Sequence, residues 1–258
     1  MSTPHSVRAR RTAVGQSLAS TCLLALATVL FGMLTSGRFT NYLQAWFRTY
    51  LLAATLVMIA LALWSLLTTS DALEDAAEQD GTDDEGRPGG HQHATPKVSA
   101  LLLVPALVFA VAAPAALGTD AATRQDAAQP RRVVGAEPVD FTPLPAQGVS
   151  ELTVQDYADR FTWGKPEDLV DKHVRMLGFV AKPKDDADGH WSVNRFRIYC
   201  CAADANLYSV AVSGADMPEG ENVWVQVEGF LDEDASTEMP VLAATDVQVV
   251  GEPEEPYL

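Results

Sequence analysis

Two long apolar runs without a charged residue dominate the front of the chain. They cover residues 14–36 and residues 50–69, and each is close to the ~20 residues that a helix needs to cross a bilayer. Neither run shows the polar stripe of a helix at the edge of a soluble core. Trp46 and Trp64 lie near the ends of the second run, where interfacial aromatic residues are common. We therefore predict two transmembrane helices within residues 1–69, preceded by a basic N-terminus.

A third apolar run covers residues 98–118 and contains Pro105 and Pro114. Proline is tolerated in spanning helices, because neighbouring groups satisfy the carbonyl that it frees. We predict a third transmembrane helix here, which gives a membrane α-helical part of two to three spans. The alternative is an internal segment that resembles a signal sequence, since small residues follow its apolar core.

Basic residues beside the apolar runs bear on orientation. Arg8, Arg10 and Arg11 precede the first run and favour a cytoplasmic N-terminus. Three spans would then place the C-terminal domain outside the cytoplasm, in a multi-pass protein of the cell membrane. Three basic residues that follow the third run favour the opposite orientation, namely Arg124, Arg131 and Arg132.

Residues 70–97 separate the second run from the third. They hold eight acidic residues and no large apolar cluster, a composition that predicts a flexible loop. His91 and His93 lie two positions apart in this loop, and imidazole with carboxylate suits zinc or a similar ion. The alternative is a solvated linker in which two histidines happen to occur.

The remaining residues read as a linker and a soluble domain. Four prolines in residues 119–149 indicate an extended linker. Residues 152–161 predict a short helix capped by Thr153, and a second short helix is expected at residues 166–172. Five runs rich in aromatic and β-branched residues follow, and Gly178 suits a bend in the first of them. We predict that residues 150–258 form a small all-β barrel of the OB type, with a β-sandwich as the alternative.

Charge is unevenly divided along the 258 residues. Residues 1–69 carry a net charge of +5, residues 70–97 carry −6, and the rest holds 26 acidic against 11 basic residues, which accounts for the total of −16. A soluble domain this acidic would repel phosphates, so nucleic acid is excluded as a partner. Divalent cations or a basic partner protein fit better.

The chemistry of the domain is concentrated in one short motif. Cys200 and Cys201 precede Asp204 by four and three positions, and thiolates with a carboxylate suit zinc, copper(I) or another transition metal. Arg195 and Arg197, just upstream, would lower the pKa values of the thiols. Adjacent side chains of a strand point to opposite faces, so a shared ion requires a bulge or turn. The alternative is one buried and one surface cysteine.

At this motif the chain resembles the YcgQ-like family of membrane permease subunits. The resemblance rests on a strand with Arg195, Phe196 and Ile198 that runs into Cys200–Cys201–Ala202–Ala203–Asp204–Ala205, and on the stretch GRFTNYL between the first two apolar runs. It covers essentially the whole chain. It implies a membrane subunit that works beside a separate multi-span permease, and a link to metal ions.

Three functions follow as hypotheses, and none is enzymatic. The sequence lacks a phosphate loop, an HExxH motif and a nucleophile elbow. The first hypothesis is an accessory permease subunit whose C-terminal domain binds a cation or docks the permease, because the spans lack the polar groups that transport paths need. The others are a membrane-anchored metal or redox sensor, and a protein-binding module without a transport role.

Overall fold

The chain divides into two compact units in a computed structural model that describes residues 4–78, 108, 115–125, 137–182 and 190–258. The first unit is Met1–Phe39 with Trp46–Pro114, and the second is Thr40–Ala45 with Ala115–Leu258. The short segment that joins the first two helices therefore belongs to the C-terminal unit.

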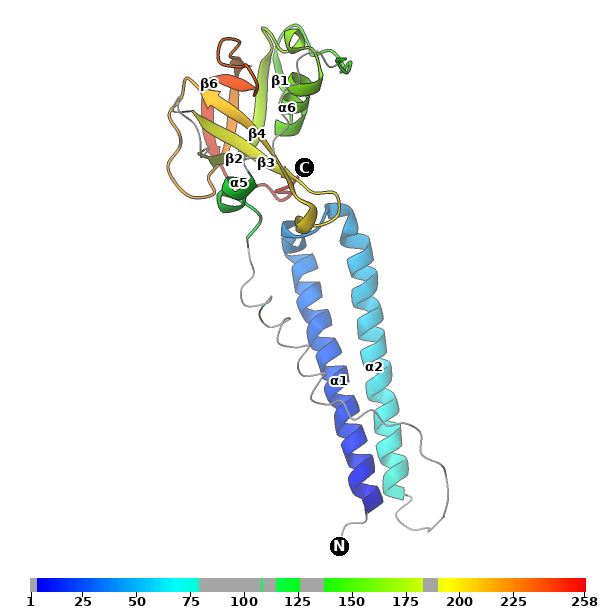
Figure 1. The fold of residues 1–258 in the computed structure, drawn as a ribbon. Helices are drawn as coiled ribbons and strands as arrows, with labels where there is room; N and C mark the ends of the chain where they lie inside the picture. Colours follow the sequence, from blue (N-terminus) through cyan, green and yellow to red (C-terminus); the bar gives the residue numbers. More distant parts are fainter. Residues whose placement is uncertain (1–3, 79–107, 109–114, 126–136, 183–189) are drawn as a thin grey trace. The chain divides into compact units, whose positions relative to one another are not determined.

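The first unit contains two long helices, α1 (Pro4–Thr35) and α2 (Arg48–Glu78), shown in Figure 1. Small side chains lie between them: Ala27 and Ala62 are buried, and Ser20 Oγ donates to Ser65 Oγ at 2.8 Å. Small and hydroxyl residues are typical of helix contacts in membranes, because they let backbones approach closely. One helix among the described residues, Ala45–Thr68, is long and apolar enough to span a membrane, with a mean hydropathy of 2.3.

The predicted membrane part is confirmed only in its coarse form. The apolar stretch of α1 among the described side chains, Ala19–Thr35, is shorter than a span. The predicted third helix at residues 98–118 lies almost entirely outside the described residues. The prediction of a loop over residues 70–97 is wrong for its first nine positions, because α2 continues to Glu78. Ala72, Leu73 and their neighbours favour the helix strongly enough to extend it into acidic sequence.

Six strands form the sheet of the second unit. They are β1 (Val149–Glu151), β2 (His173–Ala181), β3 (Trp191–Arg197), β4 (Asn206–Ser213), β5 (Trp224–Leu231) and β6 (Val241–Val250). Their order is β1-β2-β3-β4-β6-β5, and β5 also pairs with β2. Five of the six therefore close on themselves into a small barrel. All five predicted strands are present, and the three-residue β1 is additional.

The sheet contains both parallel and antiparallel pairs of strands. Strand β2 pairs with three neighbours, and β1 is one of them. The start of β2 pairs with β1 in parallel, its end pairs with β3 antiparallel, and its middle pairs with β5 antiparallel. Gly178 lies near the change from one neighbour to the next, where a Cβ would come within 2.5 Å of the main-chain oxygen of Asn194. The glycine predicted to bend this strand thus permits a close approach of two backbones. The register shift lies instead in β5, between Glu228 and Gly229.

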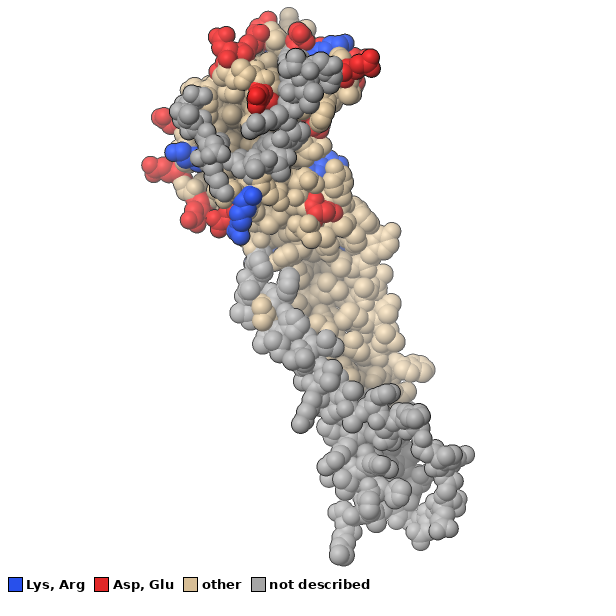
Figure 2. Space-filling model, in the orientation of Figure 1, with Lys and Arg blue, Asp and Glu red and all other residues tan. Residues whose placement is uncertain are grey.

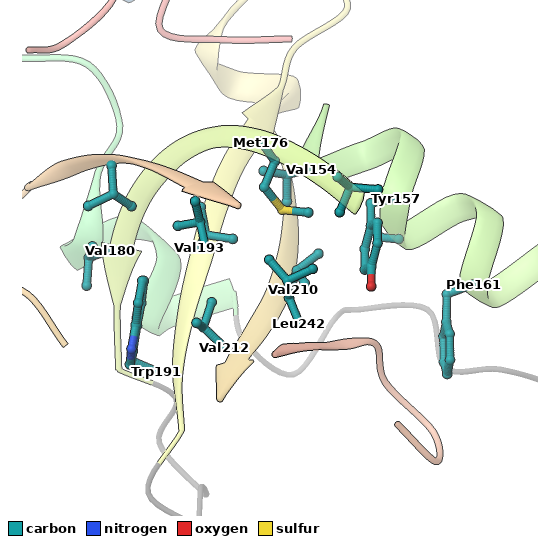
Figure 3. Close-up of a cluster of buried hydrophobic side chains, with 14 of the residues drawn as sticks. Val154, Tyr157, Phe161, Met176, Val180, Trp191, Val193, Val210, Val212 and Leu242 are labelled. Carbon is teal, nitrogen blue, oxygen red and sulfur yellow. The ribbon is translucent and has the colours of Figure 1, made fainter. Parts of the chain in front are cut away.

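One side of the barrel is filled by strand side chains and closed by helix α6 (Val154–Trp163). Val154, Tyr157 and Phe161 of the helix meet Val193 and Val210 of the strands in one buried cluster (Figure 3). The predicted N-cap is confirmed, because the Thr153 side chain accepts a hydrogen bond from the N–H of Asp156. The second predicted helix is a single 3-10 turn, Pro166–Asp168.

A second buried cluster lies on the side of the barrel from which the cysteine motif leaves. Phe179, Phe196, Ile198 and Trp224 are among its members. Helix α5 (Thr119–Gln125) contributes Ala122 to the same cluster. The prediction of an extended linker over residues 119–149 is therefore wrong in its first part, because apolar burial orders the chain directly after the third apolar run. The described residues from Ala115 onward belong to the same compact unit as the predicted domain of residues 150–258. Figure 2 shows acidic side chains at several places on the face of the domain in view.

Candidate metal centre

The two cysteines lie in the turn that links β3 to β4 (Figure 1). β3 ends at Arg197, and a 3-10 turn at Ala202–Asp204 follows. Because the backbone has left the strand, the adjacent side chains are not forced to opposite faces. The Sγ atoms of Cys200 and Cys201 lie 3.6 Å apart. With a carboxylate oxygen of Asp204 they form a set of three ligand atoms within 4.8 Å of one another.

The carboxylate of Asp204 shapes this turn. One oxygen accepts a hydrogen bond from the N–H of Tyr199 and the other from the N–H of Cys200, both at 2.9 Å. The Cys200 thiol and these main-chain donors hold the pKa of Asp204 below its usual value. When Cys200 binds an ion it loses its thiol proton, and the acceptor position that the thiol occupied on Asp204 becomes available to the ion. Asp204 can therefore both close the turn and contact an ion.

The electrostatics of Cys200 differ from the prediction. Its hydrogen bond to Asp204, with a smaller contribution from Cys201, raises the pKa of the Cys200 thiol to about 11. The expectation that Arg195 and Arg197 lower the pKa values of the thiols is wrong for Cys200. Negative charge on Asp204 opposes formation of a second negative charge beside it.

Both arginines bond to other groups. Arg195 donates to the main-chain oxygens of Glu255 and Pro256, and its guanidinium lies 5.3 Å from the centre of the Trp224 ring. Arg197 donates to the Gln155 side chain at 3.0 Å. The arginines therefore join β3 to the C-terminal tail and to α6 rather than to the thiols.

Apolar residues of the motif anchor the base of the turn. Phe196 and Ile198 are fully buried, and the Phe196 ring lies 5.7 Å from the ring of Phe179 in a stacked arrangement. Ala203 is exposed at the tip of the turn. The apolar residues at the end of β3 are thus buried in the domain, whereas the turn with the two thiols is accessible to solvent.

The segment Thr40–Ala45 also bonds to this turn, a contact that the sequence did not predict. The N–H of Ala202 donates to the oxygen of Tyr42 at 2.8 Å, and the N–H of Gln44 donates to the oxygen of Cys200 at 3.3 Å. Leu43 and Cys201 form an antiparallel bridge. The one signal in the sequence was the family-like stretch GRFTNYL, which contains Tyr42 and Leu43.

The distance between the two sulfurs is compatible with a tetrahedral ion. With Zn–S bonds of about 2.3 Å, two sulfurs of a tetrahedron lie ~3.8 Å apart, close to the 3.6 Å between Cys200 and Cys201. A linear two-thiolate ion with bonds of similar length would require ~4.6 Å. The two sulfurs of the turn therefore have nearly the spacing that zinc needs. His91 and His93, the other predicted ligands, lie outside the described residues.

Comparisons with known proteins agree with the two-part organisation. The family model for the DUF1980 N-terminal domain matches residues 18–128, and that for the DUF1980 C-terminal domain matches residues 146–258. A protein of Streptococcus mutans serotype c (strain ATCC 700610 / UA159), named "Putative two-component membrane permease complex subunit", is 24% identical over 117 residues. That alignment covers 43% of this chain and 43% of the relative, so the chain spans less than half the relative's length. No solved structure matches the chain. Because the two domain models together cover most of the sequence in the expected order, the chain belongs to the DUF1980 family.

Proposed function

We propose that this protein is an accessory subunit of a membrane permease complex and that its C-terminal domain binds a divalent cation, with zinc favoured. The observation that carries the cation site is the spacing of Cys200, Cys201 and Asp204, whose three ligand atoms lie within 4.8 Å. The permease role is supported by the family and by the name of the similar S. mutans protein. The proposed role is binding, not catalysis.

The site has the character of an exchange site. Structural zinc sites are closed by four protein ligands, whereas sites that act on a substrate keep a position open. Among the described residues, the group that could hold an ion contains three members and no fourth. Cys200 is exposed and lies at the surface of the domain. An ion held there remains accessible to water, to a small thiol or to a residue of a partner protein.

The barrel supports a binding role for the domain. Five strands that close on themselves, with a helix against one end, agree with the OB type of barrel. We place this domain outside the cytoplasm and the chain as a multi-pass membrane protein, with the helices docking on a multi-span partner. The basic residues before the first apolar run support this orientation.

The cation site is tested with the full chain purified in detergent under reducing conditions. Zinc affinity is measured by competition with a chromophoric chelator for the wild type, for Cys200→Ser and for Cys201→Ser. Ala203→Ser is the matched control, because it changes an exposed residue of the same turn and removes no ligand atom. We expect near-stoichiometric zinc in the wild type and the control, and loss in both cysteine variants. Equal binding by all four proteins would overturn the site.

The spectrum of bound cobalt(II) tests the geometry separately. Cobalt(II) in a tetrahedral site with two thiolates gives intense visible bands and thiolate charge-transfer absorption, whereas a site of oxygen ligands gives neither. We expect both features in the wild type and their loss in Cys200→Ser. Weak bands typical of six oxygen ligands would show that the cysteines do not hold the ion.

The permease role is tested by crosslinking in native membranes, followed by detergent extraction and identification of captured proteins. Recovery of a polytopic membrane protein in stoichiometric amount supports the accessory role. A second candidate function, a membrane-anchored metal or redox sensor, is suggested by the exposed thiol of Cys200 beside Cys201. A deletion strain with unchanged cation uptake and efflux, but an altered response to oxidants, would favour the sensor over the permease subunit.

A further inference from the structure

The segment Thr40–Ala45 connects the two long helices in sequence, yet it belongs to the compact unit of the C-terminal domain. Its main chain pairs with the turn that carries the cysteines, through the bonds of Tyr42 and Gln44 and the bridge between Leu43 and Cys201. The side chain of Gln44 adds two bonds, from Nε2 to the oxygens of Ile198 at 2.6 Å and Leu258 at 2.8 Å.

Together with Asp204, this segment holds the peptide groups on either side of the two thiols. The N–H groups of Tyr199 and Cys200 donate to the Asp204 carboxylate. The oxygen of Cys200 and the N–H of Ala202 are bonded to the segment. A rotation of the backbone that moves one thiol relative to the other would therefore break bonds to Asp204 or to the segment.

We propose that the segment Thr40–Ala45 is a positioning part of the cation site, and that cation binding and the seating of this segment stabilise each other. The proposal rests on the proposed function of the same site. Two events that share one set of bonds are linked in both directions: if the segment raises the affinity for the ion, the ion must stabilise the segment by the same factor.

The consequence is a route from the ion to the membrane part of the chain. The segment ends at Ala45, which is also the first residue of the candidate span Ala45–Thr68. An ion that tightens the pairing of Gln44 with the turn therefore restrains the backbone at the start of that span. Occupancy of the site is in this way communicated to the helices through the covalent chain.

Gln44→Ala is the variant that tests the linkage. It removes the two bonds from Nε2 but keeps the main-chain pairing, so the domain retains its fold. Gln248→Ala is the matched control, because the amide of Gln248 bonds to the exposed Asp246 on β6. We expect the zinc affinity of Gln44→Ala to fall by roughly three- to tenfold, as the loss of one or two net hydrogen bonds implies, and that of the control to stay unchanged.

The reciprocal measurement is the effect of zinc on the rate of amide hydrogen exchange in residues 40–45. If Gln44 only stabilised the fold, zinc would not change this rate. In the full chain, zinc should slow exchange of the amide of Gln44, because an ion that prefers the seated segment stabilises it. Zinc should leave this exchange unchanged in the Cys200→Ser/Cys201→Ser double variant. Two results would overturn the linkage while leaving the site intact. One is a normal zinc affinity of Gln44→Ala, and the other is zinc binding by the wild type without slower hydrogen exchange in residues 40–45. Absence of zinc binding in the wild type would instead remove the proposed function.

Discussion

Replacement of Phe196 by alanine should strongly destabilise the C-terminal domain. Phe196 is fully buried. Its ring stacks on the ring of Phe179, with 5.7 Å between the ring centres. The side chain belongs to the cluster that also holds Ile198 and Trp224. A shorter side chain at this position leaves a cavity against the strand from which the cysteine turn emerges.

The magnitude follows from the size of the lost side chain. Truncation of a buried phenylalanine to alanine costs about 3–5 kcal/mol, the sum of lost transfer free energy and the cavity that remains. A domain whose total free energy of unfolding is about 5–15 kcal/mol would lose roughly a fifth or more of it. For a domain of this size, the midpoint of thermal unfolding should fall by roughly 10–20 °C.

Thermal unfolding is followed in the full chain by near-ultraviolet circular dichroism, which reports the packing of Trp224 and the neighbouring rings. Phe230→Ala is the matched control. Its ring stacks on His173 at 4.7 Å and is 38% exposed, so its loss should cost about 1 kcal/mol. If Phe196→Ala unfolds within a degree or two of Phe230→Ala, the buried cluster does not support the domain as we argue.

Three further predictions concern single residues of the domain. Thr153→Ala should lower the free energy of unfolding by ~1 kcal/mol, measured by denaturant titration, because the N–H of Asp156 loses its capping acceptor; Thr153→Ser should restore it. Gly178→Ala should cost about 1–3 kcal/mol in the same titration, since its Cβ would lie 2.5 Å from the oxygen of Asn194; unchanged stability would show that the strands separate easily. Cys200 should be alkylated slowly at pH 8 and about tenfold faster for each pH unit up to its pKa of about 11, because only the thiolate reacts. Site-resolved mass spectrometry measures this rate, and a plateau near pH 9 would contradict the raised pKa.

The sequence predicted the strands of the domain because their signals are local. Each of the five runs shows β-branched and aromatic residues over the length of one strand, and each forms a strand in the structure. The cap at Thr153 is equally local, since donor and acceptor lie three residues apart. β1 was missed because its three residues carry too short a pattern to distinguish it from a linker.

The structure that precedes β1 could not be predicted for a different reason. Residues 115–149 are rich in proline and polar residues, and composition alone favours a linker. The described residues of this stretch are held by distant partners: the N–H of Leu117 donates to the hydroxyl of Tyr257, and the N–H of Val139 donates to the oxygen of Trp163. Contacts between positions so far apart leave no periodic signal in one sequence.

The candidate site was predicted in its members and not in its surroundings. Cys200, Cys201 and Asp204 were chosen by ligand chemistry, and the turn brings them together. The contribution of the segment Thr40–Ala45 depends on main-chain bonds, which any residue can make and which therefore leave no trace in the side-chain pattern. The pKa of Cys200 was predicted in the wrong direction because proximity in sequence placed the arginines near it, whereas their bonds lead elsewhere.

The same bonds that build the site also limit how tightly it holds an ion. An ion at Cys200 must displace the proton of a thiol whose pKa is raised to about 11, and it must share Asp204 with two main-chain N–H groups. Both requirements reduce the apparent affinity at neutral pH below that of a structural zinc site with four preformed ligands. A closed, tighter site would retain its ion and serve the stability of the domain. A three-ligand site at an exposed turn releases its ion more easily, and this property agrees with the accessory role that we propose for the protein.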